Sequence, residues 1–278
     1  MAQDNSGHSV FALIAGHHMH VYQTGIESGV QLVFMSGSGT VSPVHDFKVL
    51  YQELAGLCRI IVIEKFGYGQ SDLYESPTDI DSLVSFQRQA IKAAGIEGPY
   101  FLVPHSMAGL EAIRWKQLYP NEIIAIIGLD MATPQTYMEW TPDTVARRVR
   151  LINRMRKCLD CGLLFWYPLN TRSLTRQEIG LQRQLWKRNA FNKCYINEAQ
   201  SLIRNVSIVE SSGRIECPIL MFVSNGRQVS KNWIDNTRQF ACQTNAQTVY
   251  LKCGHYVHHS ESKYICREIE KFISHIGK

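Results

Sequence analysis

Long hydrophobic runs are missing from this 278-residue chain. None approaches the roughly 18 residues that a helix needs to cross a bilayer, so the sequence predicts no membrane span. The N-terminus carries Asp4 and no basic region, and the apolar run at 10–14 is too short for the core of a signal peptide. A net charge of +5, spread along the chain, is too small to indicate a nucleic-acid-binding protein.

A metal-binding cysteine pattern is also lacking. The chain has eight cysteines, of which Cys158 and Cys161 have the spacing of a redox or metal pair. Because no second pair or histidine partner stands at zinc-finger distance and no secretory leader is expected, we expect ordinary thiols in a reducing cytoplasm. Internal repeats and low-complexity segments are absent, and the length suits one large core or one core with an inserted subdomain.

Apolar runs alternate with helix-like patterns over the first 132 residues. Three closely spaced runs, at 10–15, 18–23 and 30–35, are separated by turn residues and predict an antiparallel start. Later runs such as Ile123–Leu129 indicate buried strands, and the pattern at 83–94 predicts a helix that Asp79 or Asp81 can cap. Strands that alternate with helices of about 12–15 residues predict an α/β fold with a mostly parallel central sheet flanked by helices.

Residues 133–215 interrupt this alternation. They contain no continuous apolar strand, are rich in Arg, Gln, Asn and aromatics, and show helical spacing at 145–155 and 179–187. The strand pattern returns at 218–223 and 247–251, before a last helical pattern. We therefore expect a core made of residues 1–132 and 216–278, and a helical insertion at 133–215.

One serine stands at the tip of a predicted strand–helix junction. The apolar run at 100–104 ends in a turn of small residues around Ser106, and a helical pattern begins at once. A sharp turn of this kind lifts the hydroxyl out of the sheet and sets a backbone N–H beside it, as a nucleophile requires. A bare serine near a strand end is more often only a turn residue, so its meaning depends on the other strand ends.

The ends of other predicted strands carry the remaining groups of an ester-cleaving site. Such a site needs a base, an acid that orients the base, and two donors for the oxyanion. His255 follows the last strand, and Asp130 ends the strand after the serine helix. The order Ser106, Asp130, His255 is one of the known triad orders. His258 and His259 remain alternatives for the base, and Asp235 remains an alternative for the acid.

Four segments resemble motifs of the α/β-hydrolase superfamily, in the same order along essentially the whole chain. They are similar, in turn, to its oxyanion loop, its D-x-x-G-x-G-x-S segment, its nucleophile elbow and its terminal G-H segment: Phe34–Gly39, Glu64–Asp72, His105–Gly109 and Gly254–His258. The resemblance is to capped, esterase-like serine hydrolases. It implies the α/β-hydrolase fold, with 133–215 as a helical cap over the active site.

Several positions depart from the family pattern. Ser36 replaces a histidine, and Ala108 replaces a glycine, which is a small change. Pro104 is the most awkward departure, because the tight turn needs small neighbours and proline has no N–H. No carboxylate stands at 224–228, where many members carry the acid. Some members carry the acid one strand earlier, which is the position of Asp130.

The predicted function is a serine hydrolase of the carboxylic-ester type that forms an acyl-enzyme intermediate. Ser106 attacks the carbonyl, His255 transfers the proton, and Asp130 fixes the imidazole tautomer. The backbone N–H groups of Ser38 and Met107 are expected to stabilise the oxyanion.

The substrate is expected to be a small, partly apolar molecule, with no cofactor, metal ion, nucleic acid or membrane involved. The residues that we expect to contact it are Gly37, Trp140, Trp166 and Trp186, although the tryptophans could equally form the small core of the insertion. A homodimer is left open. The alternatives are a C–C bond hydrolase or aminopeptidase-type amidase with the same site, or a non-catalytic binding or signalling protein that kept the fold.

Overall fold

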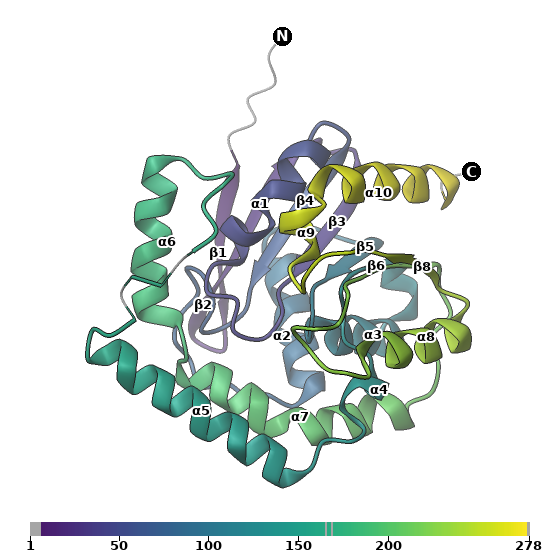
Figure 1. Ribbon diagram of the computed structural model, residues 1–278. Helices are drawn as coiled ribbons and strands as arrows, with labels where there is room; N and C mark the ends of the chain where they lie inside the picture. The colour runs from purple at the N-terminus through teal and green to yellow at the C-terminus, as the bar shows by residue number, and fades with distance from the viewer. Residues whose placement is uncertain (1–6, 165, 168, 277–278) are drawn as a thin grey trace.

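An eight-stranded sheet in the order β1-β2-β4-β3-β5-β6-β7-β8 forms the centre of the protein (Figure 1). The computed structural model describes residues 7–164, 166–167 and 169–276; the ends of the predicted core, 1–6 and 277–278, and positions 165 and 168 of the predicted insertion lie outside the described residues. The strands are β1 (His8–Ile14), β2 (His17–Gly25), β3 (Val30–Met35), β4 (Cys58–Glu64), β5 (Tyr100–Pro104), β6 (Ile123–Leu129), β7 (Ile219–Val223) and β8 (Gln247–Tyr250).

The predicted antiparallel start is correct for β1 and β2 and wrong for β3. β2 pairs antiparallel with β1 and β4, whereas β3 runs parallel to both of its neighbours, β4 and β5. The link between β2 and β3 crosses the start of β4, where the Ile26 N–H donates to the Cys58 carbonyl over 3.0 Å. Gly25, at φ +90°, permits this crossing, because a Cβ there would lie 2.2 Å from the Cys58 oxygen.

Helices cover both faces of the sheet, as the alternation of patterns predicted. Residues such as Leu32 and Phe34 of β3 face a cluster that includes α1 and α10, while Val33 and Met35 face a cluster that includes α2, α3 and α8. The Asp79 carboxylate accepts the Ser82 N–H over 3.0 Å and caps α2, as expected. These helices are α1 (Pro43–Leu54), α2 (Ile80–Ala93), α3 (Ala108–Leu118), α8 (Trp233–Thr244), α9 (Val257–Ser260) and α10 (Ser262–Ile276), with a 3₁₀ turn η1 at Pro120–Glu122.

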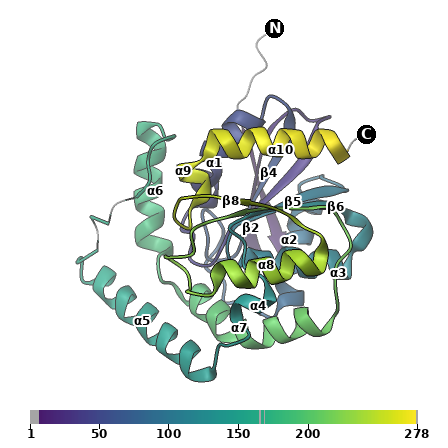
Figure 2. The same ribbon diagram turned by 45° about the vertical axis from the view of Figure 1, so that its right-hand side comes forward.

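The segment between β6 and β7 is helical. In Figures 1 and 2 α5 and α7 lie together at the bottom of the molecule, away from α10, whereas α6 stands at the left, near α1. Leu202, Val206 and Val209 of α7 pack into the main core, and Trp186 and Ala190 join a small separate cluster. The exact division of the chain at 133 and 215 stays a prediction. The helices are α4 (Pro134–Tyr137), α5 (Pro142–Asp160), α6 (Arg176–Asn189) and α7 (Lys193–Ser211).

Among the described residues, no helix is both long enough and apolar enough to span a bilayer. All eight cysteines fall within the described residues and are free thiols, including Cys158 and Cys161.

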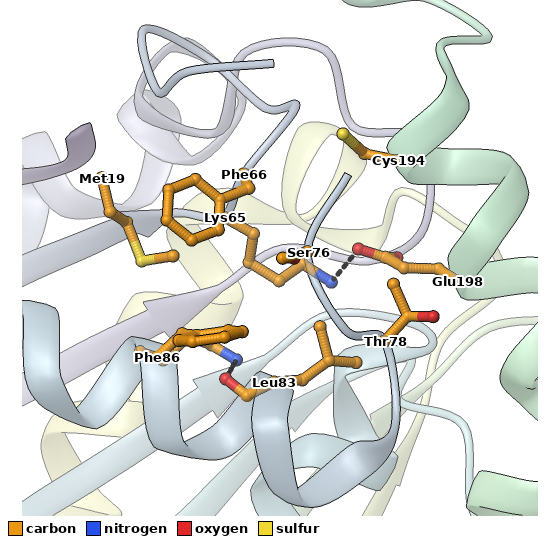
Figure 3. A pocket seen from close by; sticks show the side chains of 10 residues that line it. Met19, Lys65, Phe66, Ser76, Thr78, Leu83, Phe86, Cys194 and Glu198 are labelled. Atoms are coloured by element: carbon orange, nitrogen blue, oxygen red, sulfur yellow. Dashed lines mark hydrogen bonds and ion pairs between the residues drawn. The ribbon is translucent and has the colours of Figure 1, made fainter. Parts of the chain in front are cut away.

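A buried network of charges fastens α7 to the core. The Lys65 ammonium donates to Glu111 of α3 over 2.8 Å and lies 3.2 Å from Glu198 of α7. Figure 3 shows the Lys65 and Glu198 side chains directed toward one another beside a small cavity. Burial alone would lower the pKa of Lys65, but the two carboxylates raise it to about 12. The ammonium therefore stays charged and compensates for the burial of its partners.

Replacing the buried ammonium should destabilise the protein strongly. The change Lys65→Met keeps the length of the side chain but leaves two buried carboxylates without their cation, so we expect the free energy of unfolding to fall by about 3–5 kcal/mol. Lys271→Met is the matched control, because Lys271 pairs with Glu268 on the exposed surface and should change stability by less than about 0.5 kcal/mol. Urea unfolding of both variants measures the difference, and equal losses would contradict this account.

Candidate active site

Ser106 occupies the sharp turn that joins β5 to α3. Its φ of 53° lies in the left-handed region, which a non-glycine residue adopts only when its surroundings hold it there. The turn is held by bonds on both sides: the His105 N–H donates to the Met35 carbonyl over 2.9 Å, and the Ala132 N–H donates to the Ser106 carbonyl over 2.8 Å. Pro104 ends β5 beside Met35, so its missing N–H does not prevent the turn.

Ser106, His255 and Asp130 form one continuous chain of hydrogen bonds. The Ser106 Oγ lies 2.8 Å from His255 Nε2, and His255 Nδ1 lies 2.6 Å from Asp130 Oδ2. Since an ionised carboxylate only accepts hydrogen bonds, Nδ1 carries the proton and Nε2 is left to accept from the serine hydroxyl. The structure therefore brings together the three residues that the sequence pattern singled out.

Two further residues that sequence analysis missed hold the Asp130 carboxylate. Its Oδ1 accepts the Ser224 N–H and the Trp233 indole N–H, each over 2.7 Å. Ser224 begins the stretch 224–228, in which the sequence has no carboxylate. In the structure this stretch supplies a hydrogen-bond donor to the Asp130 carboxylate instead. The only available signal was that stretch without a carboxylate, and nothing in the sequence marked Trp233.

The alternative residues lie elsewhere. The Asp235 side chain is 75% exposed and pairs with Arg238 on α8. His258 and His259 both contact Asp46, through Nε2 atoms at 3.0 and 3.1 Å from its two carboxylate oxygens.

One group of described residues has the spacing and atom types that could hold a metal ion. It consists of Asp46, His258 and His259, whose potential ligand atoms lie within 4.8 Å of one another. Burial raises the pKa of Asp46, but the imidazoles outweigh this effect and hold it well below its usual range. Burial lowers the pKa of His259, and the bonds to Asp46 raise it above its ordinary value. Donation from the imidazoles to the carboxylate accounts for this arrangement without an ion.

The loop after β3 lies directly against the serine. A Cβ placed on Gly37 would lie 2.6 Å from the Ser106 Cβ, so only glycine allows this approach. The Gly39 N–H donates to the Tyr68 hydroxyl over 3.1 Å, and that hydroxyl donates to Glu198 over 2.8 Å. Within the described residues, the N–H groups of Ser38 and Met107 have no hydrogen-bond acceptor. Two unpaired backbone donors therefore flank the serine turn.

The three tryptophans expected at the substrate have different surroundings. Trp186 lines a cavity that also reaches Ser38 and Tyr256. Trp140 packs edge-on against Tyr137 next to the main core. Trp166 is 66% exposed. Trp186 is thus the tryptophan that shares a cavity with the loop beside the serine.

Comparisons with curated proteins reach uncharacterised relatives. No protein-family model matches the chain. The protein YbdG of Bacillus subtilis is 40% identical over 134 residues, which cover 48% of this chain and 41% of YbdG. YqjL, also from Bacillus subtilis, is 29% identical over 119 residues, which cover 43% of this chain and 46% of YqjL. The chain therefore spans less than half the length of these relatives.

Solved structures match nearly the whole chain. The haloalkane dehalogenase DbeA from Bradyrhizobium elkani superposes with a TM-score of 0.75 at 18% identity, covering 98% of both chains. An enol-lactonase from Burkholderia xenovorans superposes with a TM-score of 0.73 at 15% identity, covering 96% of this chain and 100% of the other. These structures have the α/β-hydrolase fold, and this chain has it as well, as its motifs predicted.

Proposed function

We propose that this protein is a serine hydrolase that cleaves a carboxylic ester by acyl transfer. The observation that carries the proposal is the unbroken chain of hydrogen bonds from the Ser106 hydroxyl through His255 to the buried Asp130 carboxylate. A serine hydroxyl is a weak nucleophile until a positioned base removes its proton. These hydrogen bonds position His255 as that base and fix its tautomer.

The same geometry accounts for each step of the proposed reaction. Ser106 Oγ bonds to the carbonyl carbon while His255 Nε2 takes its proton, and the N–H groups of Ser38 and Met107 bind the resulting oxyanion. His255 then returns the proton to the leaving alkoxide, which departs as an alcohol and leaves an ester on Ser106. Water, deprotonated by the same imidazole, attacks this ester, and His255 returns that proton to Ser106 Oγ as the acid is released. The chemistry requires no cofactor.

An ester suits this site better than an alkyl halide. Among the structural neighbours are a haloalkane dehalogenase and an enol-lactonase, whose name denotes an internal ester. Displacement of a halide by Ser106 would leave an ether, which has no carbonyl for water to attack. Amide and C–C bond cleavage use the same groups and are the alternatives, together with a non-catalytic binding protein. The helical segment would act as the cap, and the free cysteines suit a cytoplasmic location.

Removing the hydroxyl tests whether the site is catalytic. The change Ser106→Ala should lower the rate of p-nitrophenyl ester hydrolysis by a factor on the order of 10⁴ or more and abolish labelling by a fluorophosphonate probe, with little change in melting temperature. Ser274→Ala, on the exposed face of α10, should keep both properties. Absence of labelling in the unmodified protein would favour the binding-protein alternative, and labelling that persists in Ser106→Ala would contradict the assignment.

Amide substitutions distinguish the two candidate acids. Asp130→Asn presents a mixed donor and acceptor to His255 and so favours the wrong tautomer; we expect kcat to fall by about 10³–10⁴. Asp235→Asn changes an exposed pair on α8 and should stay within about threefold of the unmodified enzyme. Steady-state kinetics on both variants gives the answer, and the reverse pattern would assign the acid to Asp235.

The loop that carries the proposed oxyanion donor should depend on Tyr68. Tyr68→Phe removes the acceptor of the Gly39 N–H, while Glu198 keeps its contact with Lys65. Because small displacements of catalytic groups are costly, we expect kcat to fall about 10- to 100-fold with little change in KM. Tyr264→Phe, on the outer part of α10, is the matched control. A Tyr68→Phe enzyme with unchanged kcat would show that the loop holds its shape without this bond.

A further inference from the structure

Two side chains contact the main chain of His255, one at its N–H and the other at its carbonyl. The His255 N–H donates to the Gln228 side-chain oxygen over 2.8 Å, and the His255 carbonyl oxygen lies 3.3 Å from the His105 Nε2. These contacts are separate from those that the imidazole makes with Ser106 and Asp130. The main chain and the side chain of the proposed base are therefore each held at two points.

His105 connects the base to the residue beside the nucleophile. It directly precedes Ser106, and its own N–H donates to the Met35 carbonyl, which fixes it at the end of β5. The residue is 1% exposed, and the centroid of its ring lies 4.7 Å from that of the His255 ring. A hydrogen bond from this ring to the His255 carbonyl thus ties the loop that carries the base to the turn that carries the nucleophile.

One tautomer of His105 makes this bond. Since a carbonyl oxygen only accepts hydrogen bonds, Nε2 carries the proton and Nδ1 does not. Among the described residues the buried Nδ1 has no hydrogen-bond partner, so a second proton there would lack an acceptor. Burial, together with the nearby imidazoles of His258 and His255, holds the pKa of His105 well below its ordinary value. The ring therefore stays neutral and donates through Nε2.

Gln228 belongs to the stretch 224–228, whose backbone also contacts the loop after β8. The Asn225 N–H donates to the Cys253 carbonyl over 3.0 Å. The Gln228 amide lies so close to Gly254 that a Cβ at that position would be 2.5 Å from its Oε1. The glycine before His255 therefore leaves the space in which the Gln228 oxygen reaches the His255 N–H.

We propose that His105 and Gln228 are positioning residues, which hold the His255 main chain through its carbonyl and its N–H and so keep the imidazole between Ser106 and Asp130. A displacement of about 1 Å in a reacting group can lower a rate by about 100-fold. The effect of these two residues on turnover rests on the proposed function, whereas their effect on the placement of His255 does not.

Matched pairs of variants separate the hydrogen bonds from the packing. His105→Phe keeps an aromatic ring but removes the donor, whereas His105→Gln keeps an N–H. Gln228→Met removes the acceptor, whereas Gln228→Glu keeps it. In ester hydrolysis we expect His105→Phe and Gln228→Met to lower kcat about 10- to 100-fold with KM nearly unchanged, and His105→Gln and Gln228→Glu to stay within about threefold of the unmodified enzyme.

A control and two contrary outcomes complete the kinetic test. Gln184→Met, the same substitution at an exposed position of α6, should leave kcat unchanged. Equal losses of kcat in the two variants of a pair would show that packing, and not the hydrogen bond, matters at that residue. Unchanged kcat in His105→Phe or in Gln228→Met would likewise overturn the proposal for the residue concerned.

Proton NMR tests the placement of His255 without turnover. The proton between His255 Nδ1 and Asp130 should give a far-downfield resonance, because it lies in a 2.6 Å hydrogen bond to a carboxylate, and His255→Gln should remove that signal. We expect His105→Phe and Gln228→Met to broaden the resonance through exchange with water, and the two conservative variants to retain it. A signal that is equally sharp in all four variants would contradict the proposal. The expected differences in a protein that hydrolyses no ester would reject the proposed function and leave the positioning role in place.

Discussion

A single buried carboxylate ties together the parts of the proposed site. Asp130 is 1% exposed and accepts hydrogen bonds from His255 Nδ1, the Ser224 N–H and the Trp233 indole. A buried charge without such partners would be costly, so these three donors must stay in place for the fold to keep its carboxylate. They come from the loop after β8, the end of β7 and the helix α8. The orientation of His255 toward Ser106 is therefore linked to the packing of one whole edge of the sheet.

Much of this arrangement could be predicted because parallel strands end at a common edge. Ser106 and Asp130 follow β5 and β6, and the loop with Gly37 follows β3, so residues far apart in sequence were expected to meet. The pairing of β3 was predicted wrongly, since the order of strands depends on how the link at 26–29 crosses β4, and turn residues alone do not encode that path.

Partners that exist only in the folded molecule could not be found in the sequence. Trp233 fits an ordinary helical pattern, and its indole meets Asp130 only because α8 packs beside β7. Gln182 stands at helical spacing from Leu185 and Trp186, which indicates the buried face of α6, but the spacing does not show that its amide oxygen lacks a donor among the described residues.

The helical segment is connected to the site by charges as well as by packing. Glu198 of α7 contacts Lys65 and accepts a hydrogen bond from the Tyr68 hydroxyl. That hydroxyl in turn accepts a hydrogen bond from the Gly39 N–H. Burying this many polar groups brings little net stability, but directional bonds define geometry more narrowly than apolar contacts do. The position of α7 and the shape of the loop beside Ser106 are thereby linked through one hydrogen-bonded path.

The most direct test of the account is a crystal structure of the protein after reaction with a small alkyl phosphonate ester, whose adduct imitates the tetrahedral intermediate. We predict a covalent bond from Ser106 Oγ to phosphorus, with the phosphoryl oxygen about 2.7–3.1 Å from the backbone nitrogens of both Ser38 and Met107. An adduct whose phosphoryl oxygen binds neither N–H group, or a crystal with unmodified Ser106 after exposure to excess reagent, would contradict the proposal that this geometry performs acyl transfer.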